Sequence, residues 1–192
     1  MLNRRQVLKS IAAISLLDGC TTPNLTSARN FTPSGIPLRR VKVSGNRVIR
    51  SIAGLRPFRR SGFVVNAQKM NDKVVIHNYG HGGGGITLSW GTSHLAMELA
   101  NKTGLKSCAV LGCGAAGLSA ARLLQIAGWD VSIYAKDLPP NTTSNVAGGQ
   151  WSPTSVFDEQ FASPQFYQQF ESAMRHAYRY YQDLVGDEYG VR

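Results

Sequence analysis

The sequence predicts an α/β fold, and three observations lead to this prediction. Short apolar runs occupy residues 108–111 and 131–134, and a Leu- and Ala-rich stretch with helical composition, 118–127, lies between them. Two buried strands joined by a helix form a parallel βαβ unit. Further helices are expected over 87–102 and about 163–185. The chain has 192 residues, 43% of them hydrophobic, which suffices for one domain with a core.

The net charge is strongly positive, with 21 Lys and Arg against 11 Asp and Glu. An excess of this size suggests an anionic partner. The basic residues gather at the extreme N-terminus and between Arg39 and Arg60, without a motif for recognising nucleic acid. We therefore expect no nucleic-acid partner. A solvated surface, or a site for a carboxylate and a pyrophosphate, accounts for the charge.

The turn after the first apolar run carries three glycines with separate roles. Gly112 permits the tight turn, Gly114 lets the backbone approach a pyrophosphate, and Gly117 lets helix and strand pack closely. The first N–H groups of the helix are free to bind phosphate, and Gly128 is placed to end that helix. The pattern predicts a Rossmann-type dinucleotide site lined by Gly112, Cys113, Gly114, Ala115, Ala116 and Gly117.

The residue that binds the ribose in such a site is less clearly placed. An acidic residue is expected to close the second strand, about 20 residues after the glycines. Ala135-Lys136-Asp137 occupies this position here. Asp137 comes one residue late but can accept from a hydroxyl, and Lys136 can instead pair with a phosphate. Both are candidates for cofactor contacts.

Two further segments carry a more specific pattern. Residues 75–91 read VIHNYGHGGGGITLSWG, and residues 134–151 read YAKDLPPNTTSNVAGGQW. Both resemble the D-amino-acid oxidase family of FAD-dependent enzymes. The resemblance implies that the first segment cradles the flavin ring and that the second contacts the phosphates, the ribityl chain and the flavin.

The resemblance implies two sets of FAD contacts. The first set is Gly82, Gly83, Gly84, Gly85, Ile86 and Thr87, and the second is Thr142, Thr143, Ser144, Gly148, Gly149, Gln150 and Trp151. Free N–H groups at a helix start are suited to the first role, because negative charge develops on the flavin pyrimidine ring when it is reduced. An NAD-dependent dehydrogenase is disfavoured, since the loop at 82–85 would have no role in one.

The resemblance also implies the substrate contacts. Arg56, in the segment GLRPFR at 54–59, corresponds to the arginine that holds the substrate carboxylate, and its planar fork suits that role. Gly83 corresponds to the contact for the amine, and Ser152 to a position near the substrate. We assign no catalytic proton-transfer residue, because positioning dominates the hydride step in this family.

The implied reaction is oxidative deamination of a D-amino acid by FAD, with O2 as the oxidant and hydrogen peroxide as a product. A related flavin amine oxidase that acts on glycine, sarcosine or D-aspartate is the alternative. So is a truncated FAD-binding fragment without activity. The sequence does not indicate the oligomeric state.

The family's segments occur in reversed order, as in a circular permutation. Because chain termini often lie close together, such a rearrangement is physically reasonable. We divide the chain into a signal peptide (1–20), a linker (21–38), a permuted oxidase segment (39–103) that is expected to add a β-rich piece and a helix, and an incomplete FAD-binding Rossmann half (104–192). The chain stops before the positions of the family's substrate-domain sheet.

The first 20 residues resemble an export signal. Residues 3–9, NRRQVLK, are similar to a twin-arginine motif, and the apolar run that follows is shorter than the roughly 20 residues that span a bilayer. Residues 17–20, LDGC, resemble a lipoprotein processing site with Cys20 lipidated, although Asp18 departs from that pattern. We expect an exported protein, periplasmic or anchored through Cys20. A cytoplasmic protein with a frayed N-terminal helix is the alternative.

Two histidines and two cysteines are interpreted as structural. His77 and His81 are four residues apart, but they flank a strand end and no third ligand is evident. We therefore expect no metal site and interpret His77 as an ordinary packed histidine. Cys108 and Cys113 are interpreted as small buried residues.

Overall fold

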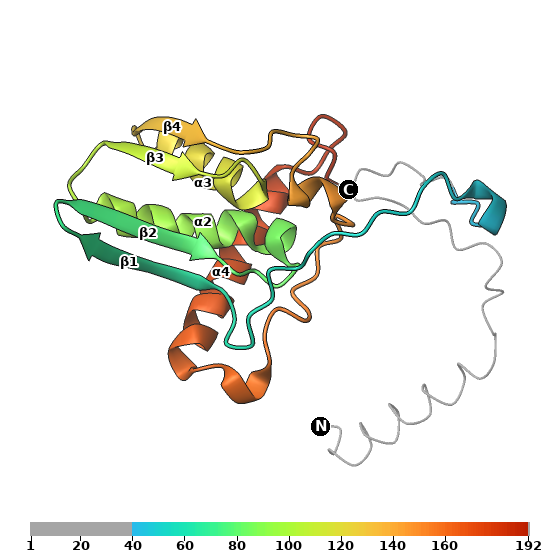
Figure 1. Ribbon diagram of the computed structural model, residues 1–192, viewed down its shortest axis with the longest axis horizontal. Coiled ribbons are helices and arrows are strands. Elements are labelled where there is room, and N and C mark those ends of the chain that lie inside the picture. The colour runs from blue at the N-terminus through green and yellow to red at the C-terminus, as the bar shows by residue number, and fades with distance from the viewer. Residues whose placement is uncertain (1–39, 192) are drawn as a thin grey trace, which may run out of the picture. The chain divides into compact units, whose positions relative to one another are not determined.

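The computed structural model describes residues 40–191 (Figure 1). The chain divides into two units, Met1–Lys42 and Val43–Arg192, and all the helices and strands below belong to the second. The proposed signal peptide, Cys20 and the 21–38 linker lie outside the described residues and stay predictions. Within the described part, the helices are too short or too polar to cross a membrane.

A β-hairpin contains the first two strands of the second unit. Its strands, β1 (Val64–Met70) and β2 (Lys73–Tyr79), pair antiparallel from Val64 opposite Tyr79 to Met70 opposite Lys73. The two-residue loop between them begins at Asn71, whose φ is 55°. Asparagine tolerates this left-handed conformation, which tight hairpin loops require.

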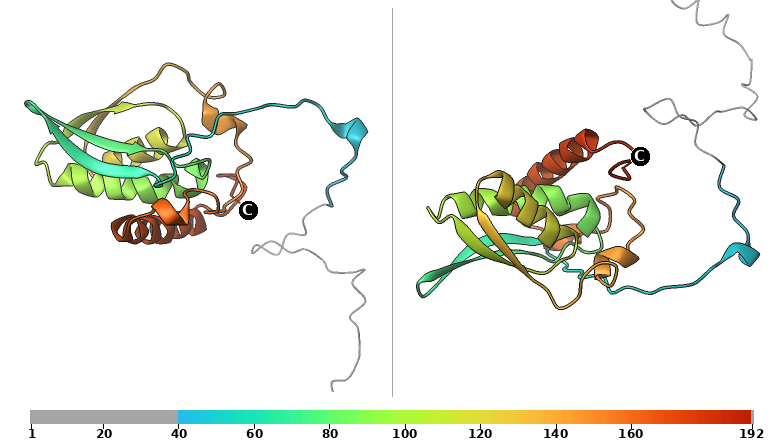
Figure 2. Two further views of the ribbon diagram at one scale, coloured as in Figure 1. Left: turned by 60° about the horizontal axis from the view of Figure 1, so that its bottom comes forward. Right: turned by 90° about the horizontal axis from the view of Figure 1, so that it is seen from above.

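The helix α2 (Gly85–Asn101) follows the hairpin and contacts β1, β2, α3 and α4. It begins two residues earlier and ends one residue earlier than the predicted 87–102 helix. Its buried residues are mostly small: Thr87, Leu88, Ser89, Gly91, Thr92, Ser93, Ala96 and Ala100. Small side chains allow neighbouring elements to approach it closely on several sides (Figure 2).

The predicted βαβ unit is present. It consists of β3 (Ser107–Leu111), α3 (Ala115–Ile126) and β4 (Asp130–Tyr134), and the two strands pair in parallel, with Leu111 opposite Tyr134. Gly128, with φ 80°, follows the helix as predicted. The α/β class is therefore confirmed in its mixed form, with one antiparallel and one parallel pair of strands in the described residues.

The last long helix, α4 (Pro164–Asp183), falls within the predicted 163–185 stretch. Ser163 caps it, because its Oγ accepts a hydrogen bond from the N–H of Phe166 at 3.1 Å, and Pro164 starts the first turn. Among residues 40–191, three short 3-10 helices complete the list of elements: η2 (Gly45–Arg47), η3 (Thr143–Val146) and η4 (Glu159–Phe161).

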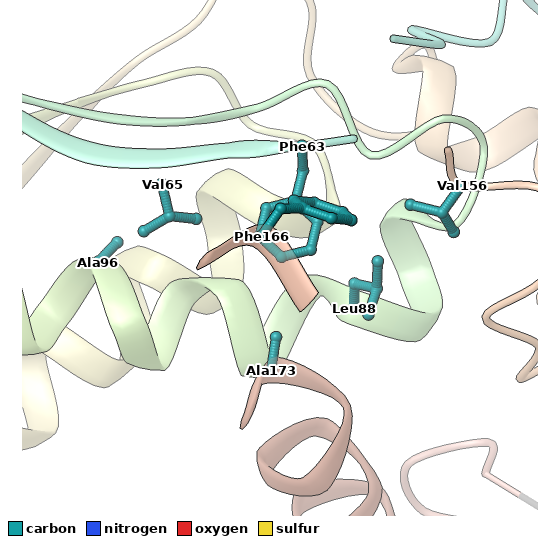
Figure 3. Packing of buried hydrophobic residues seen from close by; sticks show 7 residues of the cluster. All are labelled: Phe63, Val65, Leu88, Ala96, Val156, Phe166 and Ala173. Carbon is teal, nitrogen blue, oxygen red and sulfur yellow. The ribbon is translucent and has the colours of Figure 1, made fainter. Parts of the chain in front are cut away.

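Two groups of buried side chains make the core. The larger joins the hairpin, α2 and α4 and is shown in Figure 3: Phe63, Val65, Leu88, Ala96, Val156, Phe166 and Ala173. The smaller comprises Ala100, Leu124 and Trp129, at the contact between α2 and the βαβ unit. Cys108 packs at the edge of this second group and, like Cys113, is half-buried and free, so the prediction that both are buried was too strong.

The closest approach of α4 to α2 predicts the cost of adding one methyl group. A Cβ at Gly91 would overlap the backbone carbonyl of Ala173, and side-chain rotation cannot relieve such a clash. We expect Gly91→Ala to lower the free energy of unfolding by about 1–3 kcal/mol. Urea denaturation followed by circular dichroism measures this.

Gly85→Ala, in the first turn of the same helix, is the matched control, because its Cβ would meet only the Cβ of His81 at 3.9 Å. It should change stability little. Equal stability of the Gly91→Ala variant and the unchanged protein would contradict the packing described for α2 and α4.

Candidate cofactor and substrate site

The glycine loop between β2 and α2 is tightly enclosed. Gly82 and Gly83 have φ of 62° and 90°, a region that favours glycine. A Cβ at Gly82 would lie 2.8 Å from the carbonyl oxygen of Val156, and one at Gly83 would overlap the guanidinium of Arg56. Gly82 and Gly84 are buried, whereas Gly83 is exposed beside Arg56. The two residues predicted to hold substrate carboxylate and amine are therefore neighbours.

Arg56 is hydrogen-bonded to backbone carbonyl groups of this loop and of Ser155. Its Nε donates to the carbonyl oxygen of Gly82 at 2.9 Å, and its Nη2 donates to the carbonyl oxygens of Gly82 and Ser155, the latter at 2.9 Å. The side chain remains exposed, and no acceptor for Nη1 occurs among the described residues. Arg56 thus holds a fixed position and keeps part of its guanidinium available to an anion.

Thr87, in the first turn of α2, joins the segment after the βαβ unit to the glycine loop. Its Oγ1 lies 3.0 Å from the N–H of Ser152, and 3.1 Å and 3.3 Å from the carbonyl oxygens of Ser152 and Gln150. Trp151 packs edge-on against Tyr178, with ring centroids 5.4 Å apart. Predicted contacts from two distant parts of the sequence therefore meet at the start of α2.

The glycine turn of the βαβ unit has the close packing that the pattern predicts. A Cβ at Gly117 would overlap the carbonyl oxygen of Gly112, so only glycine allows α3 to lie this near the end of β3. The Oγ of Ser144 accepts from the N–H of Ala115 at 2.9 Å, and a Cβ at Gly114 would lie 2.9 Å from that oxygen. Ser144 is thus placed at the N-terminus of α3, as a phosphate contact would be.

The other predicted contacts are distributed along exposed loops. Lys136 and Asp137 are exposed, at the same sheet edge as Gly112, because β3 and β4 end opposite each other. The 3-10 turn η3 carries Thr143, which is exposed, and its neighbour Thr142 is half-buried. Gly148 and Gly149 are exposed, and a Cβ on either would meet no atom within 4 Å. The structure leaves all six residues accessible to a ligand.

These features suit a dinucleotide. The first residues of α2 and of α3 present N–H groups that have no acceptor within their own helix. The glycines at 82–83 and 117 keep side chains out of both helix starts. The residues present therefore fit FAD.

The two histidines differ in burial. His81 is the buried one, 5% exposed, with Nε2 2.9 Å from Thr92 Oγ1 and 3.2 Å from Asn78 Oδ1. His77 is only half-buried on the hairpin, 3.0 Å from the side-chain oxygen of Gln68. Burial lowers the pKa of His81 to about 4. Within residues 40–191 no group of three or more His, Cys, Asp or Glu is placed to hold a metal.

The strand, glycine turn and helix, together with the open helix start, give this part of the chain the geometry of a dinucleotide-binding α/β protein. The comparison with protein families agrees with this class. Residues 107–192 match the DAO family, described as FAD-dependent oxidoreductases. The resemblance seen in the sequence is therefore confirmed over residues 107–192.

Curated relatives share a shorter stretch. D-amino-acid oxidase of Streptomyces coelicolor is 37% identical over 62 residues, which are 32% of this chain and 19% of the relative. D-amino-acid oxidase of Rubrobacter xylanophilus is 42% identical over 59 residues, covering 31% and 18%. D-aspartate oxidase 1 of Caenorhabditis elegans is 38% identical over 58 residues, covering 28% and 17%. The match thus spans less than a fifth of each relative's length. No solved structure matches significantly.

The burial of His81 predicts a pH dependence of stability. Its pKa is about 4 in the folded protein, below the usual 6.5, so the unfolded chain binds the extra proton more readily. The stability contributed by neutral His81 is complete above about pH 6.5 and is lost as the pH falls towards 4. A shift of this size corresponds to about 3 kcal/mol.

Denaturation at a series of pH values, with His81→Gln as the comparison, isolates this contribution, because carboxylates titrate alike in both proteins. We expect the difference in unfolding free energy between the two proteins to shrink between pH 6.5 and 4. A difference that stays constant over this range would show that His81 is not buried as a neutral ring.

Proposed function

We propose that this chain binds FAD and carries part of the site at which a D-amino acid is oxidised. The family match supports FAD as the cofactor. The names of the curated relatives, D-amino-acid and D-aspartate oxidases, support the substrate class. The proposal extends from the matched residues to the Arg56 and 82–87 segments, which precede them in the sequence.

One observation carries the proposal. Arg56, the glycine loop and the Gln150–Ser155 segment meet at the start of α2, joined by hydrogen bonds from the Arg56 guanidinium and the Thr87 hydroxyl. These segments are up to 99 residues apart. They include residues that the resemblance assigns to the substrate carboxylate, the substrate amine and the flavin. A loop that served only to connect β2 with α2 would not require this convergence.

Each residue would contribute binding and orientation. Residues 112–117, together with Ser144, would hold the pyrophosphate, and the N–H groups of 85–87 would face the flavin. Arg56 would bind the substrate carboxylate through the part of its guanidinium not used by Gly82 and Ser155, and the carbonyl of exposed Gly83 would accept from the amine. Bound FAD supplies the hydride acceptor that no side chain provides.

The overall reaction in this proposal is balanced by oxygen and water. A D-amino acid, O2 and H2O give a 2-oxo acid, ammonia and hydrogen peroxide. The three atoms nearest to a Cβ at Gly83 all belong to Arg56, whose guanidinium is always protonated and cannot take up a proton. Catalysis would accordingly rest on the alignment of the substrate by Arg56 and the loop.

The absorption spectrum of the purified chain mixed with FAD tests this function. We expect protein-bound flavin bands that bleach under anaerobic conditions with D-alanine and not with L-alanine. Bleaching by D-aspartate alone would move the assignment to the D-aspartate oxidases. Flavin that binds but does not bleach would leave an FAD-binding chain without oxidase activity, and absence of binding to folded protein would overturn the proposal.

The position of Arg56 predicts the effect of replacing it. Arg56→Lys keeps the charge but loses the planar fork, so one charge-assisted hydrogen bond to the substrate carboxylate is lost. We expect the D-alanine concentration for half-bleaching to rise about 10- to 100-fold, with smaller change in FAD affinity.

Arg47→Lys is the control, because Arg47 is exposed in η2 and lies outside both glycine turns. It should leave both quantities unchanged. If Arg56→Lys and Arg47→Lys bleach at the same D-alanine concentration, Arg56 does not bind the carboxylate.

A further inference from the structure

A chain of buried and part-buried hydrogen bonds connects the two glycine turns. It begins at His81, which lies at the glycine loop before α2, and runs through Asn78, Ser93 and Ser119 to the first turn of α3. Ser93 and Ser119 are 0% and 4% exposed. Polar groups so deeply buried are costly unless they are paired, so their pairing constrains the positions of the elements that carry them.

The direction of the bonds can be assigned at the His81 end. The hydroxyl of Thr92 donates to the carbonyl oxygen of Leu88 at 3.1 Å, so its oxygen is left to accept from His81. The Oδ1 of Asn78 can only accept. Both neighbours of Nε2 are therefore acceptors, and the proton of neutral His81 resides on Nε2.

The remaining bonds follow in the same direction. The Nδ2 of Asn78 donates to Ser93 Oγ at 3.2 Å, and the Ser93 hydroxyl can donate to Ser119 Oγ at 3.0 Å or to the carbonyl oxygen of Ala116 at 3.1 Å. The Ser119 hydroxyl donates to the carbonyl oxygen of Ala115 at 2.7 Å. Hydrogen bonds aligned in one direction polarise and strengthen one another.

Both ends of this chain act on backbone groups that face the proposed cofactor. The peptide plane that contains the Ala115 carbonyl also contains the Ala116 N–H, and the Ala116 carbonyl shares a plane with the Gly117 N–H. Holding these carbonyls therefore aims the free N–H groups at the start of α3. At the other end, the backbone carbonyl of His81 accepts from the Gly84 N–H at 2.9 Å, which fixes the glycine loop.

The helix α2 sets the distance between the two ends. Ser93 lies eight residues after Gly85, the first residue of α2, which corresponds to about 12 Å along a helix axis. The start of α3 crosses α2 at Ser93, because Ser93 Oγ contacts the Ala116 carbonyl. The two turns are therefore offset by about 12 Å along the axis of α2.

We propose that Ser93 and Ser119 are positioning residues that hold the flavin-ring loop and the phosphate turn at the separation that one FAD molecule requires. The inference rests on the proposed function. A merely structural role would make the two serines contribute to stability alone. A positioning role makes them matter specifically for a ligand that occupies both turns at once.

The test compares a ligand that spans both turns with ligands that contact only one of them. The dissociation constants of FAD, ADP and riboflavin are measured by fluorescence and calorimetry for the full chain and for its Ser93→Ala and Ser119→Ala variants. ADP reaches only the phosphate turn and riboflavin only the ring loop. We expect each variant to bind FAD about tenfold more weakly and to bind ADP and riboflavin within twofold of the unchanged chain.

Ser89→Ala is the matched control, because Ser89 is a buried serine of the same helix whose hydroxyl donates to the carbonyl of Ile86 at 2.9 Å and otherwise lies 3.5 Å from the Tyr181 hydroxyl of α4, outside the chain from His81 to Ser119. It should leave the ratio of FAD to ADP affinity unchanged. Because alanine is a strong helix former, we expect each variant to fold. Circular dichroism checks that it does. If only one of the serine variants folds, the comparison is made on that variant.

Two results would overturn the inference. One is equal weakening of FAD and ADP binding by the serine variants, which would indicate a general loss of structure. The other is unchanged FAD binding in both variants. Failure of the unchanged chain to bind FAD would instead refute the proposed function, so the two failures are distinguishable.

Discussion

The structure depends on how closely other elements approach α2. This helix contacts the hairpin, α3 and α4, and most of its buried side chains are no larger than threonine. The backbone of α4 packs closely against α2 at Gly91, and the first turn of α3 packs closely against it at Ser93. Larger residues at these positions would separate the elements, so the small buried residues of α2 decide where both candidate ligand sites lie.

This arrangement gives a physical reason why the reversed order of the family's segments is compatible with a site. The glycine loop lies at the start of α2, and the chain passes from the end of α2 through a short loop into β3. The glycine turn after β3 then returns to α2 near its middle, at Ser93. The two turns are brought together by the packing of α3 on α2, which does not depend on which segment comes first in the sequence.

Much of the fold could be predicted because its signals are local. The glycines at 112–117 and at 128 mark the ends of β3 and α3, and the strands around them are short apolar runs. The strand β1 was not predicted, since only one of its residues, Val65, is buried and its sequence shows no clear alternation. Its best local signal is Asn71, at the start of the two-residue loop.

The candidate site was only partly predictable, because many of its contacts join residues that are far apart in the sequence. Resemblance identifies Arg56 and the glycine loop, but not that Arg56 is bound to the carbonyls of Gly82 and Ser155. It also gives no reason to prefer His81 over His77 as the buried histidine, because burial depends on Phe63 and Thr92, which come from other elements. The hydrogen bonds from Asn78 to Ser119 join residues 15 and 26 positions apart, and no local pattern reveals them.

We propose that one dinucleotide occupies both glycine turns. Hydrogen exchange of the backbone amides, followed by mass spectrometry with FAD and separately with ADP, tests it most directly. We expect FAD to protect peptides from both 82–87 and 112–117, and ADP to protect only the second. Protection of a single turn by FAD, at a concentration that saturates the protein, would show that one dinucleotide does not bridge the two turns.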